Sequence, residues 1–109
     1  MEDQEKQGIK VIFSYENRSC AIRILNPKES IKFTLEKVKE EARNYPDKLW
    51  VLPEMDNGGN RIKYYLGRLT EDGKSEILKE KLNGEEQSLF DYNVKDGDKV
   101  IIIKRVIAG

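Results

Sequence analysis

Alternating apolar and polar positions near the start of the chain predict a β-hairpin. Residues 9–14 place every second side chain on an apolar face, and residues 19–25 alternate in the same way after a short polar turn. Two such runs joined by a short turn are typical of an antiparallel hairpin. Cys20 lies on the apolar face of the second run, so we expect it to be a small buried hydrophobic residue.

The apolar spacing then changes to that of a helix. Leu35, Val38 and Ala42 follow one another at i, i+3 and i+7, which places them on one helical face. Thr34 is predicted to be the N-cap residue. The helix is expected to end just before Pro46, because the residue before a proline disfavours helical backbone.

The second half of the chain holds further strands and turns. Residues 48–53 are apolar enough for a strand or a buried arm, and residues 61–69 form a clear strand pattern. Residues 75–82 are predicted to form a short helix, and residues 88–94 a single helical turn. Residues 99–106 form the most apolar strand, which we expect at the centre of the sheet. The pattern predicts an α+β fold in which one main helix crosses a mixed sheet of four or five strands.

Composition argues against most kinds of chemistry. The 109 residues suit a single domain. One cysteine and no histidine cannot supply the roughly four ligands of a zinc site, nor an ordinary catalytic dyad. The sequence therefore predicts no metal, no cofactor and no enzymatic activity. The 20 basic and 20 acidic residues balance, whereas nucleic-acid binders normally carry a basic excess, so no nucleic-acid partner is expected.

The lack of a signal-peptide pattern and of a membrane-spanning run in this sequence leads us to expect a cytoplasmic location. The polar lead MEDQEKQG does not resemble a signal peptide, and no run approaches the roughly 20 apolar residues of a membrane span. We therefore expect a monomer that neither enters nor binds a membrane.

Three short segments resemble ubiquitin, in the same order along the chain. They are TLEKVK at residues 34–39, EDG at residues 71–73 and SLFDYNV at residues 88–94. From Asp91 onward no gap is needed, so Gly109 falls on the terminal glycine of mature ubiquitin. The resemblance implies a ubiquitin-like β-grasp fold.

The resemblance also divides the chain. It implies a flexible lead, a β-grasp domain and a flexible tail, with three insertions relative to ubiquitin. The lead is 1–8, the domain 9–104 and the tail 105–109, and the insertions are 31–33, 47–60 and 74–87.

The tail carries the sharpest functional hypothesis. In a ubiquitin-like modifier an activating enzyme uses ATP to adenylate the terminal glycine, and a conjugating enzyme passes the chain to an amine of a target protein. A deconjugating protease can reverse the reaction. The resemblance assigns activation to Gly109 and tail recognition to Arg105, Val106, Ile107 and Ala108. Ala-Gly replaces the usual Gly-Gly, and a terminal glycine with no function remains the alternative.

A second hypothesis concerns one face of the sheet. In the last strand, Val100 and Ile102 alternate with Ile101 and Ile103. The resemblance places the first pair toward the helix, and Tyr64 beside the second pair on the open side. Tyr64, Ile101 and Ile103 would then form a partner-binding surface.

An alternative for this face stays open. The extra segment around Trp50 and Leu52 would bury the face if it folded across it. Trp50 itself is expected in an apolar environment, because its large ring favours burial.

Three functions follow from the resemblance. The first is a conjugated ubiquitin-like modifier. The alternative is a non-covalent ubiquitin-like adaptor in a secretion or enzyme complex, which would use the sheet face or the insertions. A sulfur carrier ending in a thiocarboxylate is the third, although such proteins usually keep Gly-Gly.

Overall fold

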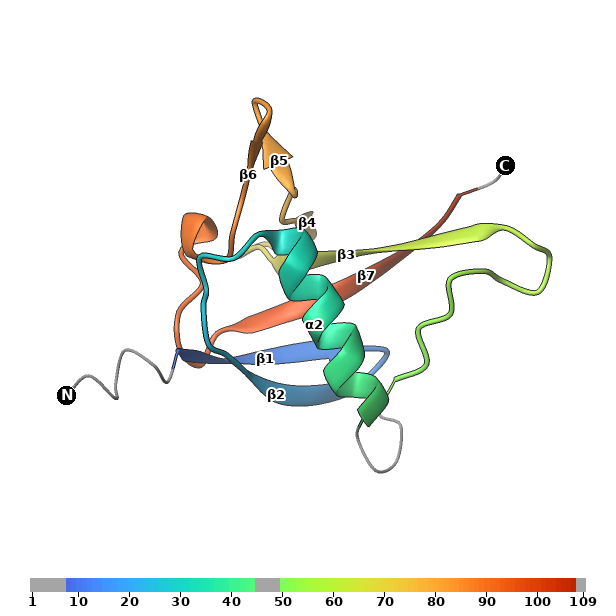
Figure 1. The fold of residues 1–109 in the computed structure, drawn as a ribbon, viewed down its shortest axis with the longest axis horizontal. Helices are drawn as coiled ribbons and strands as arrows, with labels where there is room; N and C mark the ends of the chain where they lie inside the picture. The colour runs from blue at the N-terminus through green and yellow to red at the C-terminus, as the bar shows by residue number, and fades with distance from the viewer. Residues whose placement is uncertain (1–7, 45–49, 108–109) are drawn as a thin grey trace.

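The computed structural model describes residues 8–44 and 50–107, so the predicted lead is outside it except for Gly8. The elements are β1 (Ile9–Tyr15), β2 (Arg18–Ile24), α2 (Ile31–Asn44), β3 (Arg61–Leu69), β4 (Ser75–Ile77), β5 (Lys81–Leu82), β6 (Glu85–Glu86), the 3₁₀ helix η1 (Phe90–Tyr92) and β7 (Lys99–Ile107) (Figure 1).

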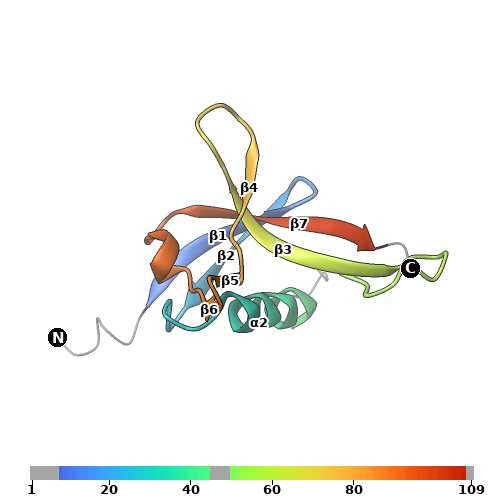
Figure 2. The same ribbon diagram turned by 90° about the horizontal axis from the view of Figure 1, so that it is seen from above.

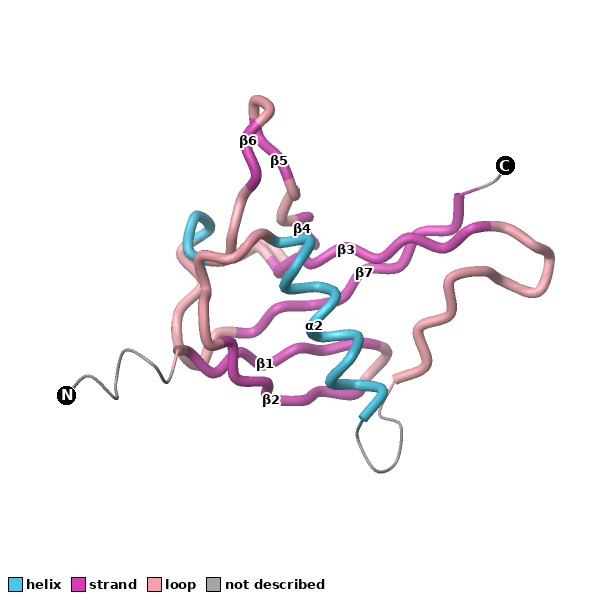
Figure 3. Tube along the Cα trace, viewed as in Figure 1, coloured by secondary structure: helices cyan, strands magenta, loops and turns pink. Residues whose placement is uncertain are grey.

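Five strands form one mixed sheet in the order β2-β1-β7-β3-β4, and β5 and β6 pair separately (Figure 3). β1 pairs with β2 in antiparallel fashion, which confirms the predicted hairpin. β7 runs parallel to β1 and antiparallel to β3, so it occupies the predicted central position. α2 lies across one side of this sheet (Figure 2). The predicted α+β architecture is confirmed.

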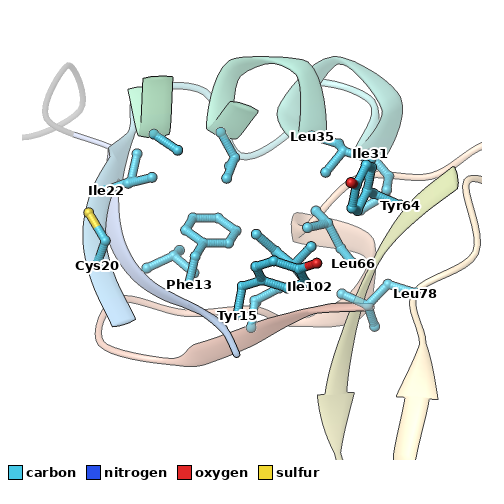
Figure 4. Close-up of a cluster of buried hydrophobic side chains, with 14 of the residues drawn as sticks. Phe13, Tyr15, Cys20, Ile22, Ile31, Leu35, Tyr64, Leu66, Leu78 and Ile102 are labelled. Atoms are coloured by element: carbon cyan, nitrogen blue, oxygen red, sulfur yellow. The ribbon is translucent and has the colours of Figure 1, made fainter. Parts of the chain in front are cut away.

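The core lies between α2 and the sheet (Figure 4). The alternating strand positions that point toward the helix are buried, including Val100 and Ile102 as expected. The apolar stripe of α2 meets them from the other side. Its buried apolar members are Ile31, Leu35, Val38 and Ala42, and the buried Thr34 lies beside them.

The helix begins one turn earlier than predicted. Ser30 is the N-cap, because its Oγ accepts the Phe33 N–H at 3.1 Å, and its carbonyl oxygen accepts the Thr34 N–H at 2.9 Å. Thr34 is therefore an interior residue, and the prediction that it caps the helix is wrong. The reason is Ile31, which is 1% exposed and extends the buried stripe by a turn. The insertion at residues 31–33 therefore forms the first turn of the helix.

The insertion at residues 74–87 forms strands, and the predicted helix at 75–82 is wrong. β4 adds a short edge strand beside β3. The Leu78 N–H continues this contact by donating to the Leu66 carbonyl at 2.8 Å. β5 and β6 then form a hairpin around Asn83 and Gly84, both with positive φ, as two-residue hairpin turns require. The predicted helical turn within residues 88–94 is confirmed by η1.

Residues 45–49 lie outside the described part of the chain, and the described remainder of the insertion, residues 50–60, forms an arm on the helix side. The arm contains no strand from residue 50 onward, and its Trp50 ring is 6% exposed. Trp50 meets Tyr15 edge to face, with 6.5 Å between the ring centroids. The arm returns to the sheet where the Ile62 N–H donates to the Glu54 carbonyl at 2.8 Å. Among the described residues, no helix is long and apolar enough to cross a membrane.

Candidate protein-binding surface

The side of the sheet that faces away from α2 carries a strip of half-buried apolar side chains. We call this side the open face (Figure 2). The strand alternation and the pairing register place five such side chains on it: Ile12, Tyr65, Ile77, Ile101 and Ile103. Ile101 and Ile103 therefore lie where the alternation in the last strand puts them.

Tyr64 does not lie on the open face. Its side chain is 2% exposed and belongs to the core on the helix side, among the labelled residues of Figure 4. The Tyr64 hydroxyl donates to the Pro53 carbonyl oxygen at 2.7 Å, and the Lys39 Nζ lies 5.4 Å from the ring centroid. Burial raises the pKa of Tyr64 to about 12, and the charges of Tyr15 and Glu16 add to the increase. The prediction that Tyr64 joins Ile101 and Ile103 in a surface is wrong.

Tyr65 occupies the position that the sequence assigned to Tyr64. It pairs across the strands with Ile103. The Lys63 Nζ lies 5.4 Å from its ring centroid and the Arg105 Cζ lies 5.8 Å from it. The ring therefore has two cations within cation–π range.

The sequence contained a signal for this assignment. Ile62, Tyr64 and Leu66 alternate as apolar residues, whereas the other positions of the strand include Lys63 and Gly67. A strand with one buried face points its continuous apolar set inward, which leaves Tyr65 outside.

Gly67 makes room for the apolar strip. A Cβ atom at this position would lie 2.5 Å from the Ile103 Cδ1 and 2.7 Å from the Glu76 carbonyl oxygen. The Ile103 side chain therefore packs over the bare backbone of Gly67, and the strip continues from β7 across β3 toward Ile77.

The arm does not cover the open face. Trp50 is buried in the core, and Leu52 packs against that core on the helix side. A cavity of about 320 Å³ lies between the arm and α2 and is lined by residues that include Trp50, Lys39 and Arg43. The alternative in which this segment buries the open face is therefore wrong.

Every charged residue at a strand position of the open face is basic. This follows from the register of the strands that the structure describes, and all of these side chains are exposed. They are Lys10, Arg23, Arg61, Lys63, Lys99 and Arg105. The chain as a whole has no net charge, so the pairing register concentrates positive charge on this side.

The structure does not show a free tail that starts at residue 105. Strand β7 runs to Ile107, and Arg105, Val106 and Ile107 pair with β3. These three tail-recognition residues are therefore held in the sheet, which contradicts a flexible segment that starts at Arg105. Ala108 and Gly109 lie outside the described residues.

The described residues offer little for metal or thiol chemistry. They contain no group of three or more His, Cys, Asp or Glu side chains that could hold a metal ion. Cys20 is 6% exposed, on the buried face of β2.

Comparisons of the sequence with protein-family descriptions and with curated proteins found no match. Solved structures do match. The ubiquitin-like domain of Plasmodium falciparum Dsk2 has a TM-score of 0.51 at 20% identity, covering 89% of this chain and 97% of the domain. The EccD5 ubiquitin-like domain from Mycobacterium xenopi has a TM-score of 0.58 at 17% identity, covering 94% of this chain and 98% of the domain.

A third match is a longer chain in a MycP5-free ESX-5 inner membrane complex. Its TM-score is 0.57 at 22% identity, and the match covers 94% of this chain but 22% of the other. At these identities the likeness concerns the fold. In the part of the chain that the structure describes, one α-helix crosses a mixed five-stranded sheet, and the chain therefore has the ubiquitin-like β-grasp fold that its sequence predicted.

Proposed function

We propose that the chain is a non-covalent protein-binding module, an adaptor, which works by binding and not by catalysis. Its open face would dock a protein surface that has acidic groups around an apolar centre. The observation that carries this proposal is the apolar strip around Tyr65 and Ile103, which has only basic residues at the charged strand positions beside it. Such an arrangement matches the apolar centre and polar rim of protein interfaces.

The chemistry of the two parts differs. The apolar strip would supply affinity by leaving water on binding. The basic residues would select partners of opposite charge and speed their approach, and this contribution weakens as salt is added. The likeness to a chain of an inner membrane complex supports a role within an assembly.

Reversing two charges on the open face should abolish this binding. In the double variant Lys63→Glu with Arg105→Glu, two exposed side chains beside Tyr65 change sign while the core is untouched. We expect capture of the partner, by the tagged protein from cells that make it, to fall about tenfold or more, since each close like-charge contact costs a few kcal/mol. Quantitative mass spectrometry of the captured proteins gives the measurement.

The matched control is Glu40→Lys, a charge reversal on the exposed side of α2. It should leave capture unchanged. Raising the salt concentration should weaken capture by the native protein and by this control alike. Equal capture by the native protein and the double variant would exclude the open face as the docking site.

The second candidate is the conjugated modifier, which the terminal Ala-Gly and the resemblance to ubiquitin favour. Incubation with ATP and a candidate activating enzyme should then give a thiol-sensitive adduct on a non-reducing gel. Deleting Gly109 should abolish that adduct and leave capture through the open face intact. If the deletion also abolished capture, the non-covalent proposal would be wrong.

A further inference from the structure

The last part of β7 has a neighbouring strand on one side only. β1 pairs with β7 at Lys99, Val100 and Ile101, and then ends. β3 pairs with β7 from Ile101 through Ile107. Figure 1 shows β3 and β7 continuing together past the end of β1. Among the described strands, none pairs with residues 102–107 on the side away from β3. We call this side the β7 edge.

The backbone groups of the β7 edge can be assigned from the register. The Ile12 N–H donates to the Asp98 carbonyl at 2.9 Å, so even-numbered residues direct their backbone groups toward the β1 side. Backbone direction alternates along a strand, so Lys104 and Val106 also point their N–H and C=O groups away from β3. No other segment that the structure describes forms a hydrogen bond with them. The edge therefore presents donors and acceptors spaced for another strand.

The side chains of this segment show which strand would fit. Val106 and Ile107 are 48% and 44% exposed, and the adjacent Lys104 and Arg105 are exposed cations. Antiparallel pairing of two copies around Lys104 and Arg105 would bring four cations together, which is unfavourable. A partner strand would fit if it placed carboxylates opposite Lys104 and Arg105. It would also need apolar side chains opposite the apolar neighbours of these two cations.

We propose that the β7 edge is a second binding site, which takes up an extended segment of another protein by strand addition. The segment has two acidic residues flanked by apolar ones. The backbone groups of Lys104 and Val106 hold its main chain, and Lys104 and Arg105 pair with its carboxylates. This site shares Arg105 with the open face, but its main-chain contacts lie along the β7 edge. The proposal does not rest on the function proposed for the open face.

A synthetic peptide tests the proposal. The acetylated and amidated sequence Val-Ile-Glu-Glu-Val-Ile carries the required pattern in both directions, so it serves for parallel or antiparallel addition. The control peptide has Lys-Lys in place of Glu-Glu. Titration into the isotopically labelled full chain is followed by amide NMR. The acidic peptide should shift the amide signals of Lys104 and Val106 most and slow their hydrogen exchange, whereas the control should not.

Two substitutions at one position separate backbone pairing from side-chain contact. Val106→Pro removes the N–H that faces the edge and leaves the bonds to β3 intact, because Val106 directs no backbone group toward β3. Val106→Thr keeps that N–H and a branched side chain. We expect the proline variant to bind the acidic peptide about fivefold more weakly, as for one lost hydrogen bond, and the threonine variant to bind within about twofold of the native chain.

Each other outcome would overturn the proposal. Equal affinity of the native chain and the proline variant would show that the backbone edge is not used. Shifts confined to Tyr65 and Ile101 would place the peptide on the open face. Concentration-dependent dimerisation that the proline variant abolishes would identify a second copy of the chain as the occupant. If no amide signal shifts at millimolar peptide, the β7 edge does not bind this kind of segment.

Discussion

Replacing Trp50 with alanine should lower the free energy of unfolding by about 3–5 kcal/mol. The indole ring is 6% exposed and meets Tyr15 edge to face, so its loss leaves a cavity beside the core. It also releases the start of the arm, which returns to the sheet through the bond between Ile62 and Glu54. The measurement is urea unfolding at neutral pH, followed by far-ultraviolet circular dichroism.

The control for this prediction is Trp50→Phe. The Trp50 Nε1 is buried and has no hydrogen-bond partner among the described residues, so the phenylalanine variant also removes a costly unpaired donor. It should therefore lose less than half as much stability as the alanine variant. A loss below about 1 kcal/mol in the alanine variant would mean that the arm does not pack in the core.

Strong periodicity is what made much of this fold predictable from its sequence. The hairpin of β1 and β2 and the strand β3 each have one buried face, so a slip of one residue would expose a whole apolar set. β7 lies between β1 and β3 and is apolar on both faces. This apolar composition predicted its central position.

Weakly patterned segments were not predictable in the same way. Residues 75–82 are short and mixed, and only the buried Leu78 and the turn at Asn83 and Gly84 decide between helix and strand. The extension of β7 to Ile107 depends on pairing with β3, a contact between residues more than 35 positions apart. Nothing local in Lys104, Arg105 or Val106 distinguishes a strand from a tail.

The sequence predicted Ile101 and Ile103 on the open face but assigned the wrong tyrosine to it. Two adjacent tyrosines must point to opposite faces of a strand, and resemblance to ubiquitin selected Tyr64. In the structure Tyr65 lies on the open face instead. The Tyr64 hydroxyl donates to the Pro53 carbonyl oxygen, in an arm that the resemblance did not cover. The basic character of the open face depends on the register of four strands, and it is invisible in a chain without net charge.

The burial of Tyr64 leads to a second large effect, a loss of stability in alkali. Its pKa in the folded chain is about 12, against 10.0 for a free tyrosine, so folding favours the neutral phenol. The stability that this contributes is fully present below pH 10 and is lost as the pH rises from 10 to 12, where the unfolded chain ionises first. A shift of this size corresponds to about 2–3 kcal/mol. Urea unfolding at pH 8, 10, 11 and 12 measures the loss.

Tyr64→Phe isolates this contribution from other groups that titrate in alkali. At pH 8 the variant should be less stable than the native chain by about 1 kcal/mol, because the bond from the Tyr64 hydroxyl to Pro53 is missing. Near pH 12 the order should reverse, since the phenylalanine has no proton to lose while the native chain must bury a phenolate or unfold. All other titrating groups are common to both proteins and cancel in the difference. Parallel stability curves for the two proteins across this range would mean that Tyr64 ionises as readily in the folded chain as in the unfolded one, and that the hydroxyl is not buried against the arm.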